Sequence, residues 1–347
     1  MASGRRRLVA GLLPIHRVPH QRSILVPPIS KYYLHSSAYF YCSETDAKDG
    51  RNSGGSGFLV NVPVEGHEGW GNLYAVTNRH VLDNGGVVLR LNKTEGGTRI
   101  KPTERTDWFD HPDRYDVSVL PLDLEGEQIE YSSIPTTEFI TRDIVEDYRI
   151  YPGDEAFLVG RLITPWGQQR NAPAVRFGNI SMMADPGDPV RGYDNVEVEA
   201  FLVECRSLSG FSGSPVFAST TRTYRADDHL PKPKNAPEPK PEGEKKGLTV
   251  TMVATSGTFG PWLLGIDWGH LPLWKPVYER DEQTQTAQRV EQNTGIACVL
   301  PAWHILDVLN DMELVKERKR DKAELDKRKK ESAVLDGAPA AQAEPGE

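Results

Sequence analysis

The stretch FLVECRSLSGFSGSPVF at residues 201–217 decides the fold, because it joins two strand-like runs through a tight turn of small residues at 210–215. A serine hydroxyl attacks a substrate only when a base takes its proton and fixed donors receive the charge on the substrate oxygen. Gly210 can adopt backbone angles closed to other residues, so its amide and that of Ser212 can point at one oxyanion. By itself this is only a Ser/Gly turn between strands, but it makes Ser212 a candidate nucleophile, with Gly210 and Ser212 as a candidate oxyanion hole.

A nucleophilic serine needs a histidine base and a carboxylate, and their order along the chain separates the known arrangements. Of the nine histidines, His80 follows the apolar run at residues 73–77, and Asp116 begins an alternating run at residues 116–122. The order His80, Asp116, Ser212 is the chymotrypsin order, whereas α/β-hydrolases run Ser, Asp, His and subtilisins run Asp, His, Ser. The sequence therefore favours the chymotrypsin arrangement.

Three segments in this order resemble the trypsin/chymotrypsin-like serine peptidases: TNRHV at 77–81, DVSVL at 116–120 and GFSGSP at 210–215. Before them, GSGFLV at 55–60 is similar to the strand that these proteins place ahead of the histidine, especially the bacterial, HtrA-like and standalone members. The resemblance covers roughly residues 35–310 in pattern. Each motif is weak by itself, and the combination in this order is specific.

The resemblance implies an all-β, chymotrypsin-like double β-barrel with a C-terminal helix, followed here by a disordered charged tail. It implies Ser212 as nucleophile, His80 as general base and then acid, and Asp116 as the group that orients the imidazole and stabilises its cation. The implied reaction is serine endopeptidase hydrolysis of a protein or peptide through an acyl-enzyme, without a cofactor.

Composition and the rhythm of short strands predict the domain organisation. A disordered basic leader is expected at 1–30, a first barrel with the histidine and aspartate at 31–130, and a second barrel with the serine at 131–310. Residues 219–247 are dense in Lys, Pro and Glu and are expected to form a disordered insertion, and 311–347 a charged tail.

Specificity within this family depends on the residue six before the nucleophile, which is Arg206, next to Ser207. If that alignment holds, an arginine at the base of the pocket repels basic substrate side chains. The alternative is that Arg206 points to solvent after a one-residue slip of the loop. Asp267, Trp268 and Gly269 are similar to the pocket-wall strand whose backbone pairs with an extended substrate.

The residue before the nucleophile is Phe211, where the secreted trypsins have an aspartate that receives a new N-terminus on activation. The oxyanion turn must therefore be held by packing or be ordered by an activating protein partner, acting through 219–247 or 311–347. The competing class of function is a non-catalytic trypsin-fold module that binds an extended peptide or a protein. The α/β-hydrolase class is excluded because its Gly-x-Ser-x-Gly motif requires glycine at the position that Ser214 occupies here.

The net charge of −8 argues against a nucleic-acid partner, since phosphate binding favours a basic face. No apolar run reaches the about 18 residues of a membrane span, so no membrane partner is expected. An odd and sparse set of cysteines, Cys42, Cys205 and Cys298, predicts a reduced, cytoplasmic setting. Cys205 and Cys298 lie in apolar strand-like runs and are expected to be buried structural thiols. The alternative is organelle targeting or export through residues 1–43, which are basic and contain no acidic residue.

Five residues crowd together before and at the candidate aspartate: Asp107, Asp110, His111, Asp113 and Asp116. Their spacing matches neither a calcium loop, which needs a glycine hinge and a distal glutamate, nor a zinc pair on one helix face. The sequence therefore predicts no metal site, and the acidic residues are expected to belong to a surface loop.

Overall fold

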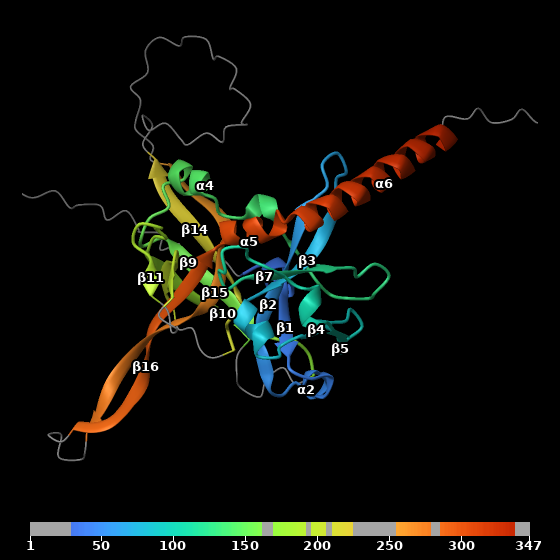
Figure 1. The fold of residues 1–347 in the computed structure, drawn as a ribbon. Helices are drawn as coiled ribbons and strands as arrows, with labels where there is room; N and C mark the ends of the chain where they lie inside the picture. The colour runs from blue at the N-terminus through green and yellow to red at the C-terminus, as the bar shows by residue number, and fades with distance from the viewer. Residues whose placement is uncertain are drawn as a thin grey trace, which may run out of the picture. The chain divides into compact units, whose positions relative to one another are not determined.

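The computed structural model describes residues 29–161, 169–191, 196–205, 210–224, 255–278 and 285–336 (Figure 1). The chain divides into the units Met1–Ser30 and Lys31–Glu347, and all described helices and strands belong to the second. The predicted leader therefore lies almost wholly outside the described residues.

The first sheet contains the strands that surround the candidate histidine and aspartate. Its strands are β1 (Ser37–Tyr41), β2 (Ser53–Pro63), β3 (Gly71–Thr77), β4 (Val88–Asn92), β5 (Thr98–Pro102), β6 (Phe109–Asp110), β7 (Ser118–Leu122) and β8 (Ile134–Pro135). They lie in the order β5-β4-β1-β2-β3-β7-β6, with β8 beside β2. Alternate side chains of these strands enclose one apolar core that includes Phe40, Leu59, Ala75, Leu89, Trp108 and Leu120.

Six strands close the barrel that carries the candidate serine, in the order β10-β13-β16-β15-β14-β9. Their bounds are β9 (Glu155–Arg161), β10 (Pro173–Met182), β13 (Phe201–Glu204), β14 (Pro215–Tyr224), β15 (Thr255–Tyr278) and β16 (Gln285–Pro301). A separate pair consists of β11 (Val190–Arg191) and β12 (Glu197–Val198). Figure 1 shows β15 and β16 continuing as a hairpin well beyond the other strands of the barrel.

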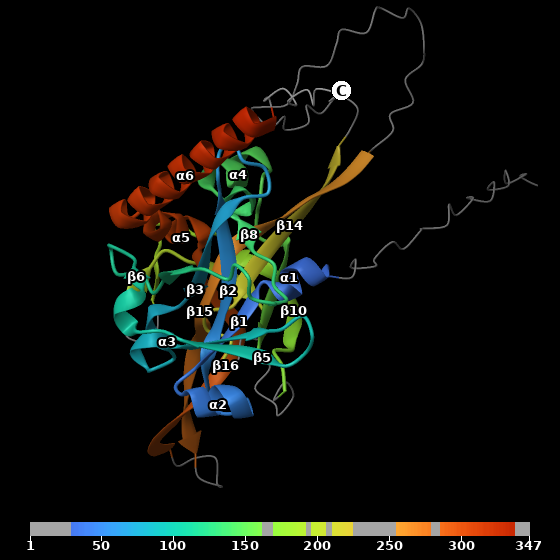
Figure 2. The ribbon, with the colours of Figure 1, turned by 90° about the vertical axis from the view of Figure 1, so that its right-hand side faces the viewer.

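The helices are mostly short and lie at the edges of the sheets. They are α1 (Lys31–His35), α2 (Glu44–Asp49), α3 (Arg79–Asp83), α4 (Arg142–Asp147), α5 (Ala302–Leu309) and α6 (Met312–Asp336), with 3-10 turns at Arg105–Asp107 and Thr136–Glu138. Helix α5 buries Ala302, Ile305 and Leu309, as the apolar spacing predicts. Figure 2 shows α5 leading directly into α6.

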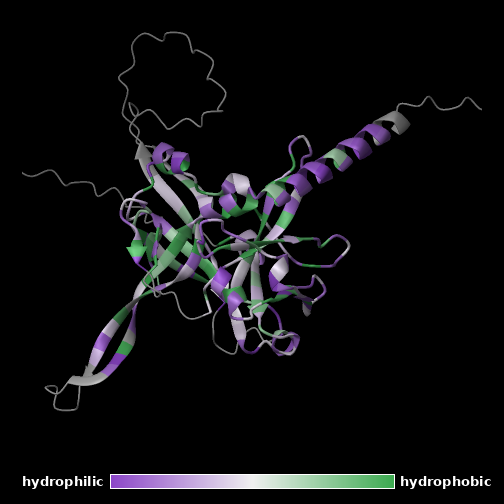
Figure 3. Cartoon of the chain, in the orientation of Figure 1, coloured by the Kyte–Doolittle hydropathy of each residue, from purple (hydrophilic) through white to green (hydrophobic). Residues whose placement is uncertain are grey.

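Helix α6 is rich in charged residues and is coloured almost entirely as hydrophilic in Figure 3. Polar contacts hold it against the β2–β3 hairpin, among them Lys322 to Glu65 at 2.9 Å, Asp326 to His67 at 2.7 Å and Arg318 to Tyr74 at 3.0 Å. The prediction of a disordered tail was therefore wrong for residues 312–336. Tertiary contacts supply the support that an isolated charged helix lacks.

The prediction of a β fold of chymotrypsin type is confirmed, with three differences in detail. By strand pairing among the described residues the first β system is an open sheet, whereas a closed barrel was expected. Strand β8 pairs with β2, so this sheet runs past the predicted boundary at residue 130. Strand β14 runs to Tyr224 because it pairs with β15 through Thr255, so the predicted insertion begins too early. Residues 225–247 and 337–347 lie outside the described residues.

All three cysteines are free, with Cys42 exposed and the other two buried. Burial, with a smaller effect from the charge of Asp267, raises the pKa of both Cys205 and Cys298 to about 12. Such thiols stay protonated at neutral pH, which agrees with the predicted role of buried packing groups. Among the described helices, none combines the length and apolar composition of a membrane span.

Candidate active site

His80 and Asp116 form a doubly hydrogen-bonded pair at the edge of the first sheet. Helix α3 begins just after β3, and this turn directs His80 toward the loop that precedes β7. The His80 amide donates to Asp116 Oδ1 at 2.8 Å, and His80 Nδ1 lies 2.5 Å from Asp116 Oδ2. The Asn78 side-chain amide donates to the Asp116 carbonyl at 2.7 Å. These bonds place the imidazole proton on Nδ1 and leave Nε2 able to accept a proton.

The electrostatics of this pair suit a general base. Burial lowers the pKa of His80, but the hydrogen bond and charge of Asp116, with the charges of Asp267 and Asp83, outweigh that effect. The pKa of His80 is therefore raised above its usual value of 6.5. The same carboxylates stabilise the imidazolium that forms when the histidine takes a proton.

Hydrogen bonds attach the turn that carries Ser212 to the first sheet. The Ser56 amide donates to the Ser212 carbonyl at 2.9 Å, and Ser56 Oγ donates to the Gly210 carbonyl at 2.8 Å. Thr77 Oγ1 in turn donates to the Ser56 carbonyl at 2.8 Å. Because Thr77 is the last residue of β3 and precedes His80 by three positions, the turn lies beside the start of α3. Within the described residues, no hydrogen bond joins Ser212 Oγ to His80.

The two glycines of the turn have left-handed backbone angles. Gly210 has φ +90° and Gly213 has φ +89°, in a region that favours glycine. A Cβ at position 213 would lie 2.0 Å from the Ser56 carbonyl oxygen and 2.7 Å from Thr77 Oγ1. Among the described residues, neither the Gly210 nor the Ser212 amide donates to another group. Both donors are therefore available to a substrate oxygen.

Phe211 anchors the turn in the barrel interior, in place of the salt bridge of the secreted trypsins. Its side chain is fully buried, and the guanidinium carbon of Arg176 lies 4.9 Å from the ring centroid. A Cβ at Gly160 would lie 2.6 Å from the Phe211 ring and 2.2 Å from Ser214 Oγ. The absence of a side chain at position 160 thus makes room for the ring, which packs closely between Gly160 and Arg176.

Asp267 on β15 contacts the turn from the other side. The Gly213 amide donates to the Asp267 carbonyl at 2.9 Å, and the Asp267 amide donates to the Ser214 carbonyl at 2.9 Å. The Asp267 side chain is fully buried, so its carboxylate acts on the His80 charge from within the protein and does not line an open pocket. This electrostatic role was missed at the level of sequence, because nothing in the order of residues places Asp267 near His80.

The remaining predicted substrate residues have mixed outcomes. Trp268 and Gly269 are partly exposed on β15. One edge of β15 pairs with β16, and the other edge pairs with β14 only as far as Ile266. At Trp268 and Gly269 no described strand pairs with that second edge. Arg206 and Ser207 lie outside the described residues, so the predicted effect of Arg206 on specificity stays a prediction.

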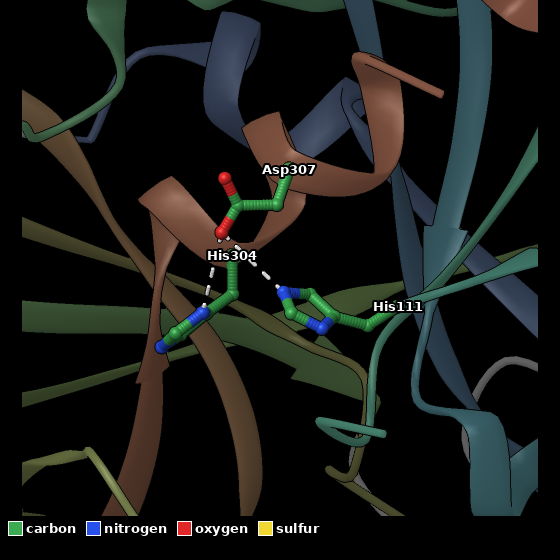
Figure 4. A group of neighbouring side chains, drawn as sticks. All are labelled: His111, His304 and Asp307. Carbon is green, nitrogen blue, oxygen red and sulfur yellow. Dashed lines mark hydrogen bonds and ion pairs between the residues drawn. The ribbon is translucent and has the colours of Figure 1, made fainter. Parts of the chain in front are cut away.

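A second cluster of titratable residues joins the loop before Asp116 to helix α5 (Figure 4). Asp307 Oδ2 lies 3.4 Å from His111 Nε2 and 3.6 Å from His304 Nδ1. Both imidazoles are buried, whereas Asp307 is exposed. The three groups lie close enough together to be compared with a metal site.

The tautomer of His111 disfavours that interpretation. Its Nδ1 accepts a hydrogen bond from the Asp113 amide at 3.1 Å. Neutral His111 therefore carries its proton on Nε2, which faces Asp307, so this nitrogen offers a proton where a cation needs a lone pair. The geometry instead fits a hydrogen-bonded contact between the loop and α5.

Buried charge completes this contact. His304 Nε2 lies 3.4 Å from Glu199 Oε2, and Glu199 accepts two hydrogen bonds from Arg142 at 2.7 and 2.9 Å. The Tyr115 ring stacks on His304 at 3.7 Å. We call His111, Glu199, His304 and Asp307 the α5 clamp. Because Tyr115 directly precedes Asp116, the clamp fixes the chain that presents the candidate catalytic carboxylate.

The other acidic residues of the predicted crowd make local contacts. Asp110 accepts hydrogen bonds from Arg105 at 2.7 Å and from Ser118 at 2.6 Å. Asp107 accepts from the Glu104 amide at 2.9 Å. These carboxylates shape the loop, as the sequence predicts.

Comparison with known proteins identifies the class. Residues 55–223 match the family model described as trypsin-like peptidase domain. This span includes His80, Asp116 and Ser212, and it confirms the resemblance that the motifs indicate. Residues 55–223 are therefore similar to a trypsin-like peptidase domain, and this similarity and the fold class both support a peptidase.

Two similar solved structures are of tobacco etch virus protease. The catalytically active protease in complex with product is 11% identical, with 88% of this chain and 89% of that chain covered and a TM-score of 0.40. The catalytically inactive protease in complex with substrate is 10% identical, with 83% and 88% covered and a TM-score of 0.38. No curated protein matches the chain.

Proposed function

We propose that this protein is a serine endopeptidase in which Ser212 is the nucleophile, His80 the general base and acid, and Asp116 the orienting carboxylate. The observation that carries the proposal is the His80–Asp116 pair, bonded through both carboxylate oxygens, beside a turn that the Ser56 hydrogen bonds attach to the same sheet. The turn supports the proposal further, because Gly210 and Gly213 have positive φ and, among the described residues, the amides of Gly210 and Ser212 donate to no other group.

The proposed reaction proceeds by acyl transfer. His80 Nε2 takes the proton of Ser212 Oγ as this oxygen bonds to the substrate carbonyl carbon. The carbonyl oxygen becomes an oxyanion, and the amides of Gly210 and Ser212 donate to it. The imidazolium then gives its proton to the leaving amine, the peptide C–N bond breaks, and water hydrolyses the acyl-enzyme with the same proton transfers.

The proposed substrate is an extended segment of a protein or peptide. The open edge of β15 at Trp268 and Gly269 can pair with such a segment by main-chain hydrogen bonds. This pairing would set the scissile carbonyl beside the Ser212 turn, because the preceding residue, Asp267, is hydrogen-bonded to Gly213 and Ser214. Nothing in this chemistry requires a cofactor, and the proposal includes none.

Labelling with a fluorophosphonate probe tests the activated serine, and hydrolysis of fluorescein-labelled casein tests peptide-bond cleavage. The wild type should be labelled, whereas Ser212→Ala and His80→Ala should lose labelling, because one missing member removes most of a roughly 10⁶-fold triad contribution. Ser214→Ala is the matched control, since Ser214 is the neighbouring hydroxyl and is fully buried. It should keep the label.

Two results would contradict the proposal. A folded wild type that takes no label would favour the non-catalytic peptide-binding module, unless a partner protein restores labelling. A label that survives Ser212→Ala and is lost in Ser214→Ala would show that the nucleophile is misassigned.

A further inference from the structure

The β15–β16 hairpin continues beyond the barrel as an arm, defined here as residues 272–278 paired with 285–293. Strand β13 covers β16 only from Ile296 to Val299, and β14 covers β15 only as far as Ile266. Within the described residues, no strand lies on either outer edge of the arm. In Figure 1 the arm lies apart from the other labelled elements.

Large apolar side chains of the arm are exposed. Leu273 is 44% exposed, Trp274 52% and Val290 54%. Leu273 and Val290 share one face, because Leu273 pairs with Gln292 and Val290 pairs with Lys275. An isolated two-stranded ribbon with such side chains in water is only marginally stable. We therefore expect the arm to bind the surface of another protein chain.

Prolines close one edge of the arm and leave the other open. Pro272 and Pro276 have no amide proton, and a proline in a strand is tolerated where that proton would face away from the neighbouring strand. The main-chain nitrogens of Pro272 and Pro276 therefore face the outer edge of β15. Because neither nitrogen carries a proton, this edge has two hydrogen-bond donors fewer. Pro272 pairs with Asn293 and Pro276 with Arg289. Residues directly opposite in an antiparallel pair face the same way, so positions 289 and 291 of β16 present main-chain donors and acceptors outward.

We propose that a second copy of this chain adds to the open edge of β16, antiparallel and related by a twofold axis at Val290. This register sets Val290 against Val290, Gln288 against Gln292 and Arg289 against Glu291 of the other copy. Positions 289 and 291 are those whose main chain faces outward, so each opposed pair can exchange two backbone hydrogen bonds. The two arms then form one four-stranded sheet.

The self-complementary charge selects this register. The twofold brings an arginine opposite a glutamate twice, which favours pairing, whereas like charges in these positions would oppose it. Moving the axis by one residue sets Arg289 against Asn293, or Glu291 against Ala287, and the charge match is lost. The same twofold sets Val290 of one copy directly against Val290 of the other, on the face that Leu273 shares, so this apolar pair gains contact.

Charge exchange combined with light scattering tests the proposal. The wild type should form a dimer whose fraction rises with concentration. Arg289→Glu alone sets two glutamates together, and Glu291→Arg alone sets two arginines together, so each should weaken dimerisation by roughly tenfold or more. The double variant Arg289→Glu/Glu291→Arg restores opposite charges and should dimerise like the wild type.

Mixing the two single variants gives the sharpest result. One chain then carries glutamate at both positions and the other carries arginine, so an equimolar mixture should form a heterodimer, although each variant alone stays mainly monomeric. Thermal unfolding of each variant checks that the fold is kept. A wild type that is monomeric at every concentration would overturn the proposal and leave the edge to another protein. Dimers unaffected by both single changes would place the interface elsewhere and equally overturn it.

Discussion

The close approach of Gly213 to the first sheet allows a sharp test of the oxyanion turn through Gly213→Ala. The new Cβ would lie 2.0 Å from the Ser56 carbonyl oxygen, an atom of the backbone that cannot rotate away. The turn must therefore move by about 1 Å to restore ordinary contact, and a displacement of this size costs about 10²-fold in rate. The Ser56 hydrogen bonds to the turn would lengthen with it, so Ser212 and its donors would shift together.

A matched control separates this contact from backbone strain. Gly96 has φ +92°, close to the +89° of Gly213, but a Cβ at Gly96 would meet nothing within 4 Å. Alanine at either position costs about 1–2 kcal/mol of strain in the left-handed region. Gly96→Ala should therefore lose similar stability but keep the labelling rate, whereas Gly213→Ala should lose about 10²-fold in that rate.

The assay is the second-order rate of fluorophosphonate labelling, measured beside urea unfolding of both variants. Labelling of folded Gly213→Ala at the wild-type rate would refute the argument, because the turn would then not depend on its contact with Ser56. An equal loss in Gly96→Ala would show that strain alone explains the effect.

Three further predictions follow from the site and the core. Because the pKa of His80 is raised, labelling should increase with pH with a midpoint above 6.5, and Asp267→Asn, which removes a charge that raises this pKa, should move the midpoint to lower pH. Burial and the charge of His111 lower the pKa of His304 to about 4, so between pH 6.5 and pH 4 the unfolded chain binds a proton at His304 that the folded protein does not bind. The free energy of unfolding should therefore fall as the pH drops from 6.5 toward 4. Urea unfolding at several pH values should show a smaller fall in His304→Gln. Gly160→Ala crowds the Phe211 ring and should cost about 1–3 kcal/mol of stability, measured by urea unfolding, with full stability counting against this packing.

Part of the candidate site could be read from the sequence because its signals are local. The glycines of the Ser212 turn, the strand that ends before His80 and the alternating run that begins at Asp116 each occupy a few consecutive residues. Their order along the chain is specific because the known arrangements of such residues differ in it. The apolar spacing that predicts α5 is equally local.

The tail and the insertion show where local composition misleads. Residues 312–336 are strongly charged, which is typical of disorder, yet they form α6 because the β2–β3 hairpin supplies partners such as Glu65 and His67. Likewise β14 extends to Tyr224 because β15 lies beside it. The composition of a segment indicates how much apolar surface the segment can bury by itself. It does not indicate which distant segment will pack or pair against it in the folded chain.

The sequence by itself determined the class of the fold, the order of the candidate triad residues and the small-residue turn, since each depends on short-range spacing. Only the tertiary structure decided that Asp267 acts on His80 from within the protein, that His111 meets His304, and that no described strand covers the outer edge of β16 beyond the barrel. The first two features join residues 150 or more positions apart. The third depends on β13 and β14 ending before the strands β16 and β15 that they pair with. Electrostatic interaction and hydrogen bonding act through space, so their partners are fixed only when the chain has folded.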